Sequence, residues 1–147
     1  MRGPAKTAYL AVIFSALIAP GCLEDLLEFV PDDSYEPNNS IAQAEPITDS
    51  TTFTDAFMIF DSIDHYVFTT SGAGNIEVLV TPLGWGADCT AALLLDDGVT
   101  EVGTVVVAGD LITITHNGVG SAETFYIRVE RADGATGGPY GLAVSVS

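Results

Sequence analysis

The amino-acid sequence predicts an all-β domain, either a sandwich or a barrel, and three observations support this prediction. Apolar and polar residues alternate in short segments from Thr51 onward. Turn-forming residues separate these segments at intervals of roughly 8 to 12 residues. Gly, Thr and Val are abundant, which favours strands and turns over helices. We therefore expect about eight strands, at 51–60, 65–70, 75–81, 90–95, 99–107, 110–116, 123–131 and 139–146.

The clearest strand patterns lie near the end of the chain. Phe125, Ile127 and Val129 alternate with polar residues within 123–131. The segment 139–146 alternates large apolar residues with small ones. Both patterns indicate antiparallel strands that bury one face and expose the other.

Two apolar runs lack this alternation, namely Leu93-Leu94-Leu95 and Val105-Val106-Val107. Such runs fit strands that are covered on both faces, or an interface. The expected turns are Gly72-Ala73-Gly74-Asn75, Asp96-Asp97-Gly98, Asn117-Gly118 and the loop at 133–138.

Residues 1–21 have the pattern of a signal peptide. Arg2 and Lys6 precede an apolar run at 8–19 that is too short to span a bilayer as a resident helix. The run ends in Leu17-Ile18-Ala19-Pro20-Gly21-Cys22, which resembles the lipobox of bacterial lipoproteins, where the cysteine is acylated. We therefore expect an exported chain that is anchored to a membrane of the bacterial cell envelope by lipid on Cys22.

An ordinary secretory signal cut nearby is the alternative, and it would leave Cys22 as a plain thiol. In that case Cys22 and Cys89 are candidates for a disulfide, whereas a lipidated Cys22 leaves Cys89 alone as a small apolar residue near a strand start. Residues 22–34 are expected to form an acidic tether, and 35–147 are expected to form the β domain.

The charge balance excludes one class of partner. The chain has 4 basic and 20 acidic residues, and only Arg128 and Arg131 follow Cys22. Nucleic acid binding needs cations that neutralise phosphates, so nucleic acid is excluded. An acidic surface attracts metal ions, although solubility or a salty habitat explains the same composition.

Four segments in order resemble the bacterial pre-peptidase C-terminal domain, a β-sandwich module often appended to secreted proteases and related to collagen-binding modules of clostridial collagenases. They are Tyr35-Glu36-Pro37-Asn38-Asn39-Ser40, Ile63-Asp64-His65-Tyr66-Val67-Phe68, Thr124-Phe125-Tyr126-Ile127-Arg128-Val129 and Gly138-Pro139-Tyr140-Gly141-Leu142-Ala143-Val144. The resemblance covers 33–146 and implies an antiparallel, jelly-roll-like β-sandwich.

The resemblance also implies a calcium site. In collagen-binding relatives, the segment before the domain and the loop before the first core strand supply the ligands. Carried over, this implies Glu36, Asn38, Asn39, Asp61 and Asp64. Calcium takes about 6–8 oxygen ligands and prefers carboxylates and amide carbonyls, so the chemistry is consistent. The alternative is structural, with a capped turn at 36–39 and Asp64 as a hydrogen-bond acceptor at the start of a strand.

No catalytic motif accompanies the two histidines, His65 and His116, which are expected to be structural or surface residues. Trp85 is expected to anchor a loop. We expect a non-catalytic, lipid-anchored binding module of the cell envelope, with an extracellular protein or glycan as ligand. The alternative is an accessory or targeting subunit of a separate secreted peptidase, and an orphan enzyme is the least expected.

Overall fold

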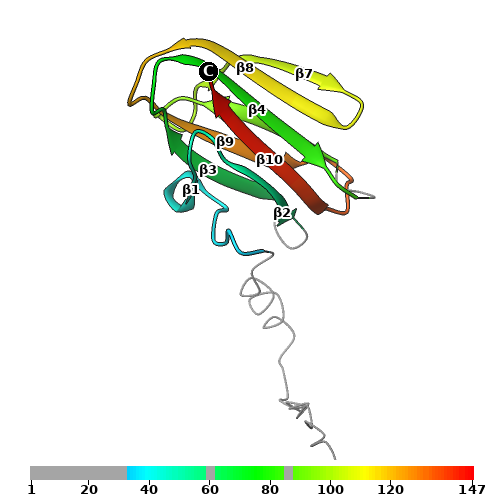
Figure 1. The fold of residues 1–147 in the computed structure, drawn as a ribbon. Helices are drawn as coiled ribbons and strands as arrows, with labels where there is room; N and C mark the ends of the chain where they lie inside the picture. Colours follow the sequence, from blue (N-terminus) through cyan, green and yellow to red (C-terminus); the bar gives the residue numbers. More distant parts are fainter. Residues whose placement is uncertain (1–32, 59–61, 85–87) are drawn as a thin grey trace, which may run out of the picture.

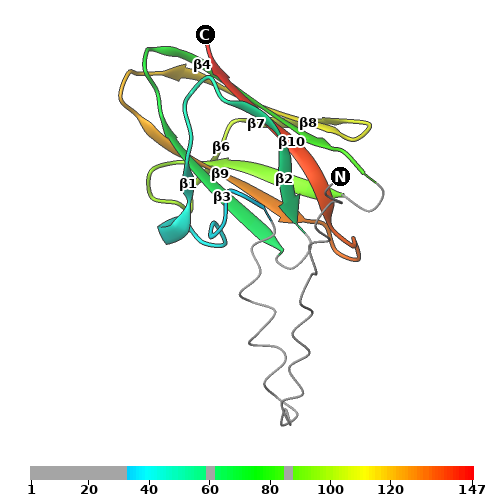
Figure 2. The ribbon, with the colours of Figure 1, turned by 60° about the horizontal axis from the view of Figure 1, so that its bottom comes forward.

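The computed structural model describes residues 33–58, 62–84 and 88–147, which form two β-sheets packed face to face (Figures 1 and 2). The prediction of an all-β sandwich is confirmed. The one helix among these residues is the single 3₁₀ turn η1 (Ile41–Gln43).

Each sheet contains five strands. In spatial order, the first sheet consists of β1 (Glu45–Pro46), β3 (Ile63–Thr69), β9 (Thr124–Arg131), β5 (Cys89–Leu94) and β6 (Glu101–Val102). The second consists of β2 (Thr52–Met58), β10 (Gly138–Val146), β4 (Gly74–Pro82), β8 (Leu111–Val119) and β7 (Thr104–Ala108). Neighbouring strands are antiparallel, except that β1 runs parallel to β3.

The core lies between the sheets because one face of each long strand is apolar. In the first sheet, the inward residues include Tyr66 and Phe68 of β3, which face the same side as Phe125 and Ile127 of β9. The second sheet contributes Ile76, Val78 and Val80 of β4, Ile112 and Ile114 of β8, and Tyr140, Leu142 and Val144 of β10. Burial of each large side chain contributes about 1.5–3 kcal/mol to the free energy of unfolding.

The prediction of one strand at 99–107 is wrong in one respect, because this segment forms two strands that belong to different sheets. β6 pairs with β5, whereas β7 pairs with β8. The chain crosses between the sheets at Gly103, whose φ is 87°. A Cβ at this position would lie 2.7 Å from the carbonyl oxygen of Thr115, so glycine is required both by φ and by space.

Two other expectations need correction. Val105-Val106-Val107 is not covered on both faces, because these residues are 49%, 55% and 65% exposed. Asn117-Gly118 is not a turn between strands but part of β8, beside the register shift at the start of β4. The short strand β1 was not predicted, because two residues are too few to show a periodic pattern.

Candidate functional site

The segment 35–40, here called the docking segment, lies along β3 at its start. The backbone N–H of His65 donates to the carbonyl oxygen of Asn38 at 2.8 Å. The same oxygen lies 3.3 Å from Nδ1 of the His65 ring, which donates to it in the tautomer protonated there. Asn38 is fully buried. The two oxygen-rich stretches, separate in sequence, therefore meet in the folded chain.

Within the docking segment, the backbone N–H of Asn38 donates to Oε2 of Glu36 at 2.9 Å. Asn39, the next residue, is exposed to solvent. Asp61 and Cys22 lie outside the described residues, as does Trp85. Of the predicted calcium ligands, the structure thus places Glu36 and Asn38 in one turn beside the strand that carries Asp64.

Asp64 is fully buried and belongs to a hydrogen-bonded chain of side chains that joins the two sheets. The Tyr140 hydroxyl on β10 donates to Oδ2 of Asp64 on β3. The hydroxyls of Tyr66 and Tyr140 lie 2.5 Å apart. Burial, followed by the negative charge of Asp64, raises the pKa of Tyr66, and burial is also the main cause of the raised pKa of Tyr140. Both phenols therefore stay neutral and serve as hydrogen-bonding groups.

Tyr35 fixes the docking segment to the second sheet. Its ring stacks on Phe53 of β2 with centroids 4.4 Å apart, and its edge contacts the ring of Tyr66. Its hydroxyl donates to Oδ1 of Asp55 at 2.8 Å. Burial and the Asp55 carboxylate raise the pKa of Tyr35 to about 12. The docking segment is therefore held by β2 through Tyr35 and by β3 through Asn38.

The predicted calcium ligands suit a hard cation by type, since they are carboxylate and amide oxygens from a turn and a strand start. Across the described ranges, however, no three His, Cys, Asp or Glu side chains gather closely enough to hold a metal ion. Amide and backbone oxygens of Asn38 and Asn39, together with Asp61, would have to complete the shell around Glu36 and Asp64. The donor chemistry fits calcium, and the contacts of Glu36 and Asp64 also fit the structural alternative of a capped turn and a buried acceptor.

A buried threonine holds the opposite end of β3, and no sequence pattern predicted it. The Thr70 hydroxyl donates to the Gly120 carbonyl at 2.8 Å and accepts the Glu123 N–H at 3.0 Å. The Thr70 N–H donates to the Glu123 carbonyl at 2.9 Å. Thr70 therefore closes the turn between β8 and β9 against the end of β3.

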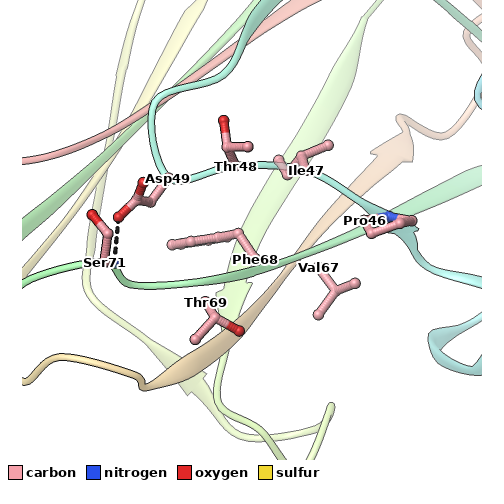
Figure 3. A pocket seen from close by; sticks show the side chains of 8 residues that line it. All are labelled: Pro46, Ile47, Thr48, Asp49, Val67, Phe68, Thr69 and Ser71. Atoms are coloured by element: carbon pink, nitrogen blue, oxygen red, sulfur yellow. Dashed lines mark hydrogen bonds between the residues drawn. The ribbon is translucent and has the colours of Figure 1, made fainter.

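An open hollow of about 410 Å³ lies between the chain after β1 and the end of β3 (Figure 3). It is lined by Pro46, Ile47, Thr48, Asp49, Val67, Phe68, Thr69 and Ser71. Figure 3 shows the Asp49 carboxylate turned to Ser71, whose backbone N–H donates to it at 2.6 Å. Hydrogen bonds from the Ser71 side chain and, second, from its backbone N–H lower the pKa of Asp49. The hollow contains none of the predicted site residues.

The two histidines and Cys89 pack against other parts of the fold. Burial lowers the pKa of His65, and the ring of His116 meets Phe125 edge-on at 5.8 Å. Burial raises the pKa of Cys89 to about 11, so its thiol is neutral and unreactive near pH 7. Since Cys22 lies outside the described residues, a disulfide between Cys22 and Cys89 stays untested.

Together these features define a class: a two-sheet antiparallel β-sandwich whose docking segment is fixed to both sheets. The fold is similar to a crystal structure of the pre-peptidase C-terminal domain of collagenase from Bacillus anthracis. The TM-score is 0.59 and the sequence identity 25%, over 69% of this chain and 94% of that one. The resemblance inferred from the four segments is thus supported by a structural match. No family model and no curated protein matches the chain.

None of the helices within 33–58, 62–84 and 88–147 is long and apolar enough to cross a membrane. Membrane attachment through Cys22 stays a prediction, as do the boundaries at 1–21, 22–34 and 35–147.

Proposed function

We propose that this chain is a non-catalytic binding module that acts outside the cytoplasm, anchored to the bacterial cell envelope by lipid on Cys22. The observation that carries the proposal is the structural match to a pre-peptidase C-terminal domain. The acidic composition and the signal-like residues 1–21 support export. The ligand that we propose is an extracellular protein or glycan.

The name of the matched structure favours a second candidate of a different class. That domain is part of a collagenase, which is a peptidase, and the match covers 94% of the matched chain. The present chain would then be an accessory or targeting subunit. It would bind either a separate secreted peptidase or the matrix protein on which such a peptidase acts.

A pull-down from envelope extract separates these candidates. The full chain with a C-terminal tag is the bait, and the same bait carrying Tyr140→Phe controls for non-specific binding through a destabilised sandwich. Capture of a peptidase favours the accessory role. Direct binding to collagen-coated surfaces or to glycan arrays favours adhesion. Hydrolysis of casein or gelatin by the purified chain, lost on His65→Ala or His116→Ala, would contradict a non-catalytic role.

Substitution of each of the two cysteines in turn tests whether Cys22 is lipidated. Cells that express the full chain with a labelled fatty acid should label the parent and Cys89→Ser but not Cys22→Ser. Cys89→Ser is the matched control, because it removes one thiol and leaves the signal unchanged. Equal labelling of all three chains, or labelling of none, would contradict the anchor.

We also propose that calcium binds where the docking segment meets β3, through Glu36, Asn38, Asn39, Asp61 and Asp64. The support is the pairing of Asn38 with His65, which brings the two stretches together. Extracellular calcium modules have dissociation constants of about 10⁻⁴ to 10⁻³ M. At ~1 mM calcium, a site of ~10⁻⁴ M raises the free energy of unfolding by roughly 1.4 kcal/mol.

Thermal melts in EDTA, in calcium and in magnesium test this site. We expect calcium to raise the melting temperature by on the order of 4–8 °C per kcal/mol and magnesium to raise it less. Asp64→Asn should abolish most of the response, and Asp61→Asn part of it. Asp96→Asn is the matched control, because Asp96 is exposed in a turn of the first sheet. A melting temperature that calcium does not change would contradict the calcium site. It would favour the structural alternative of a capped turn at 36–39 with Asp64 as a buried hydrogen-bond acceptor.

A further inference from the structure

Among the residues that the structure describes, β7 is the outer edge of the second sheet and has no further strand beside it. β7 pairs with β8 on one side, and its other side faces solvent at the margin of the molecule (Figure 1). All five of its residues are exposed. The row of backbone N–H and C=O groups that points away from β8 is therefore open to a further strand.

The other three sheet edges are protected. β1 and β6 contain two residues each, too few to pair with a long strand. β2 is longer, but it carries Asp55, and Tyr35 of the docking segment packs against its Phe53. β7, with the sequence Thr-Val-Val-Val-Ala, carries no charge and no proline. Among the described edges, β7 alone lacks the features that block strand addition.

The side chains of β7 extend the core beyond the cover of the first sheet. In an antiparallel pair, facing residues lie on the same side of the sheet. Val105 faces Ile114, and Val107 faces Ile112. Both isoleucines are buried, yet Val105 and Val107 are 49% and 65% exposed. The apolar inner face of the sheet thus continues past its covered part.

We propose that β7 pairs antiparallel with β7 of a second copy of this chain, about a two-fold axis at Val106. In this register Val106 faces Val106, Val105 faces Val107, and Thr104 faces Ala108. Along a strand, the N–H and C=O groups of every second residue point to the same side. Facing residues in this register are an even number of positions apart in sequence, so their backbone groups point outward together and can pair across the axis. The strand is complementary to itself, as a two-fold interface requires.

The charge distribution favours a second copy at this edge, because β7 itself carries no charge. The chain carries a net charge of −16, so two copies repel wherever acidic residues meet. β7 has none. Asp110, two residues after β7, would lie near the residues that precede β7 in the other copy, where Glu101 is neutralised by Arg128 at 2.7 Å. Like charges therefore do not face each other across the axis.

Disulfide formation tests the register. In full-length chains expressed in cells, Val106→Cys should form a covalent dimer on mild oxidation, because facing Cα atoms in an antiparallel pair lie about 4.5–5.5 Å apart. Val99→Cys is the matched control, since Val99 is 77% exposed in the turn before β6 and away from the axis. The parent chain, which keeps Cys22 and Cys89, gives the background.

Light scattering of the purified full chain tests the interface without cysteine chemistry. We expect twice the monomer mass for the parent and for Val99→Glu, and the monomer mass for Val106→Glu. Both variants add one negative charge to an exposed valine, so a difference between them depends on β7. Association should stop at two copies, because pairing uses both bare edges.

Three results would overturn the proposal: a monomeric parent at all concentrations, equal loss of association in both glutamate variants, or failure of Val106→Cys to cross-link above Val99→Cys. Cross-linking of Val106→Cys to a different protein would show that the edge accepts a strand from another partner and would likewise overturn the dimer. The Val99 variants keep the same Cys22 and signal as the parent, so each difference between the Val106 and Val99 variants is independent of calcium, of lipid and of the envelope ligand.

Discussion

The docking segment and β7 lie at opposite margins of the sandwich, and the two margins differ in whether their backbone groups are covered. The docking segment adds backbone pairing to β3 through Asn38 and places Tyr35 over Phe53 of β2. It covers the edge strand β2 and the start of β3, which lies before the residues of β3 that pair with β1. β7 stays uncovered, apolar and uncharged. The margin at the docking segment therefore stabilises the fold of one chain, whereas the margin at β7 is free to contribute to an assembly.

The largest expected effect is at Gly103, where the chain turns from the protected edge β6 to the bare edge β7. Gly103→Ala should lower the free energy of unfolding by about 3 kcal/mol, because a Cβ would meet the Thr115 carbonyl and φ is positive. Gly109→Ala is the control: its φ is 63° but nothing lies within 4 Å of its Cβ, so about 1 kcal/mol is expected. Urea denaturation measures both, and equal losses would contradict the steric contribution.

The second effect concerns the buried hydroxyls beneath the docking margin. Tyr140→Phe removes the donor to Asp64 and the partner of Tyr66, and it should lower the free energy of unfolding by about 2 kcal/mol. Tyr66→Phe removes one hydroxyl and leaves the Tyr140 donor to Asp64 in place, so it should cost about 1 kcal/mol. Chemical denaturation of the two variants compares them. A reversed order would mean that the Tyr140 contact to Asp64 contributes little.

The third effect is a loss of stability in alkali. Burial raises the pKa of Cys89 from 9.0 to about 11, and burial with Asp55 raises that of Tyr35 from 10.0 to about 12. Between these limits the unfolded chain has lost protons that the folded chain still holds, so rising pH favours unfolding. The slope should be at most about 1.4 kcal/mol per pH unit for each group.

Urea midpoints at pH 8, 9.5 and 10.5 measure this loss. Cys89→Ser should remove the part that begins near pH 9, and Tyr140→Phe should reduce the part that begins near pH 10, since the pKa of Tyr140 is also raised. Val106→Thr, which changes no titrating group, serves as the control. A midpoint that is constant over this range would contradict the raised pKa values.

The smallest effect is expected at β7 in the separate chain. At protein concentrations low enough to keep the parent monomeric, Val106→Glu should change the free energy of unfolding by no more than about 0.5 kcal/mol, because the side chain is more than half exposed. A loss above about 1.5 kcal/mol would place Val106 in the stabilising core of the monomer and erase the contrast between the two margins.

Much of the sandwich could be predicted from the sequence because each long strand repeats a two-residue pattern. Tyr66 and Phe68, like Phe125 and Ile127, are buried on one face as their alternation predicted. The break at Gly103 could not be predicted, because its cause is the carbonyl of Thr115 on another strand. A local pattern records which residues are apolar but not which sheet receives them.

The candidate site was predictable to a similar degree. The turn formers around Glu36 and Asn38 and the acid at Asp64 stand out in the sequence, and the folded chain brings them to the same strand. The hydroxyl of Tyr140 does not stand out, since 76 positions separate it from Asp64. Thr70 was missed for the same reason, because five strands lie in sequence between it and its partners.

The position of the docking segment also determines how the molecule responds to mechanical force. A pull on the chain before Tyr35 reaches the ring stack on β2 and the Asn38 bond to β3 before it reaches β1. Tension is thereby divided between both sheets from the first contact, and the strands of the core are shielded from being peeled off one at a time. If the module is held by its N-terminal end in flowing medium, a moderate force would open the Tyr35 stack and the Asn38 hydrogen bond first. The sandwich itself would stay intact at that force.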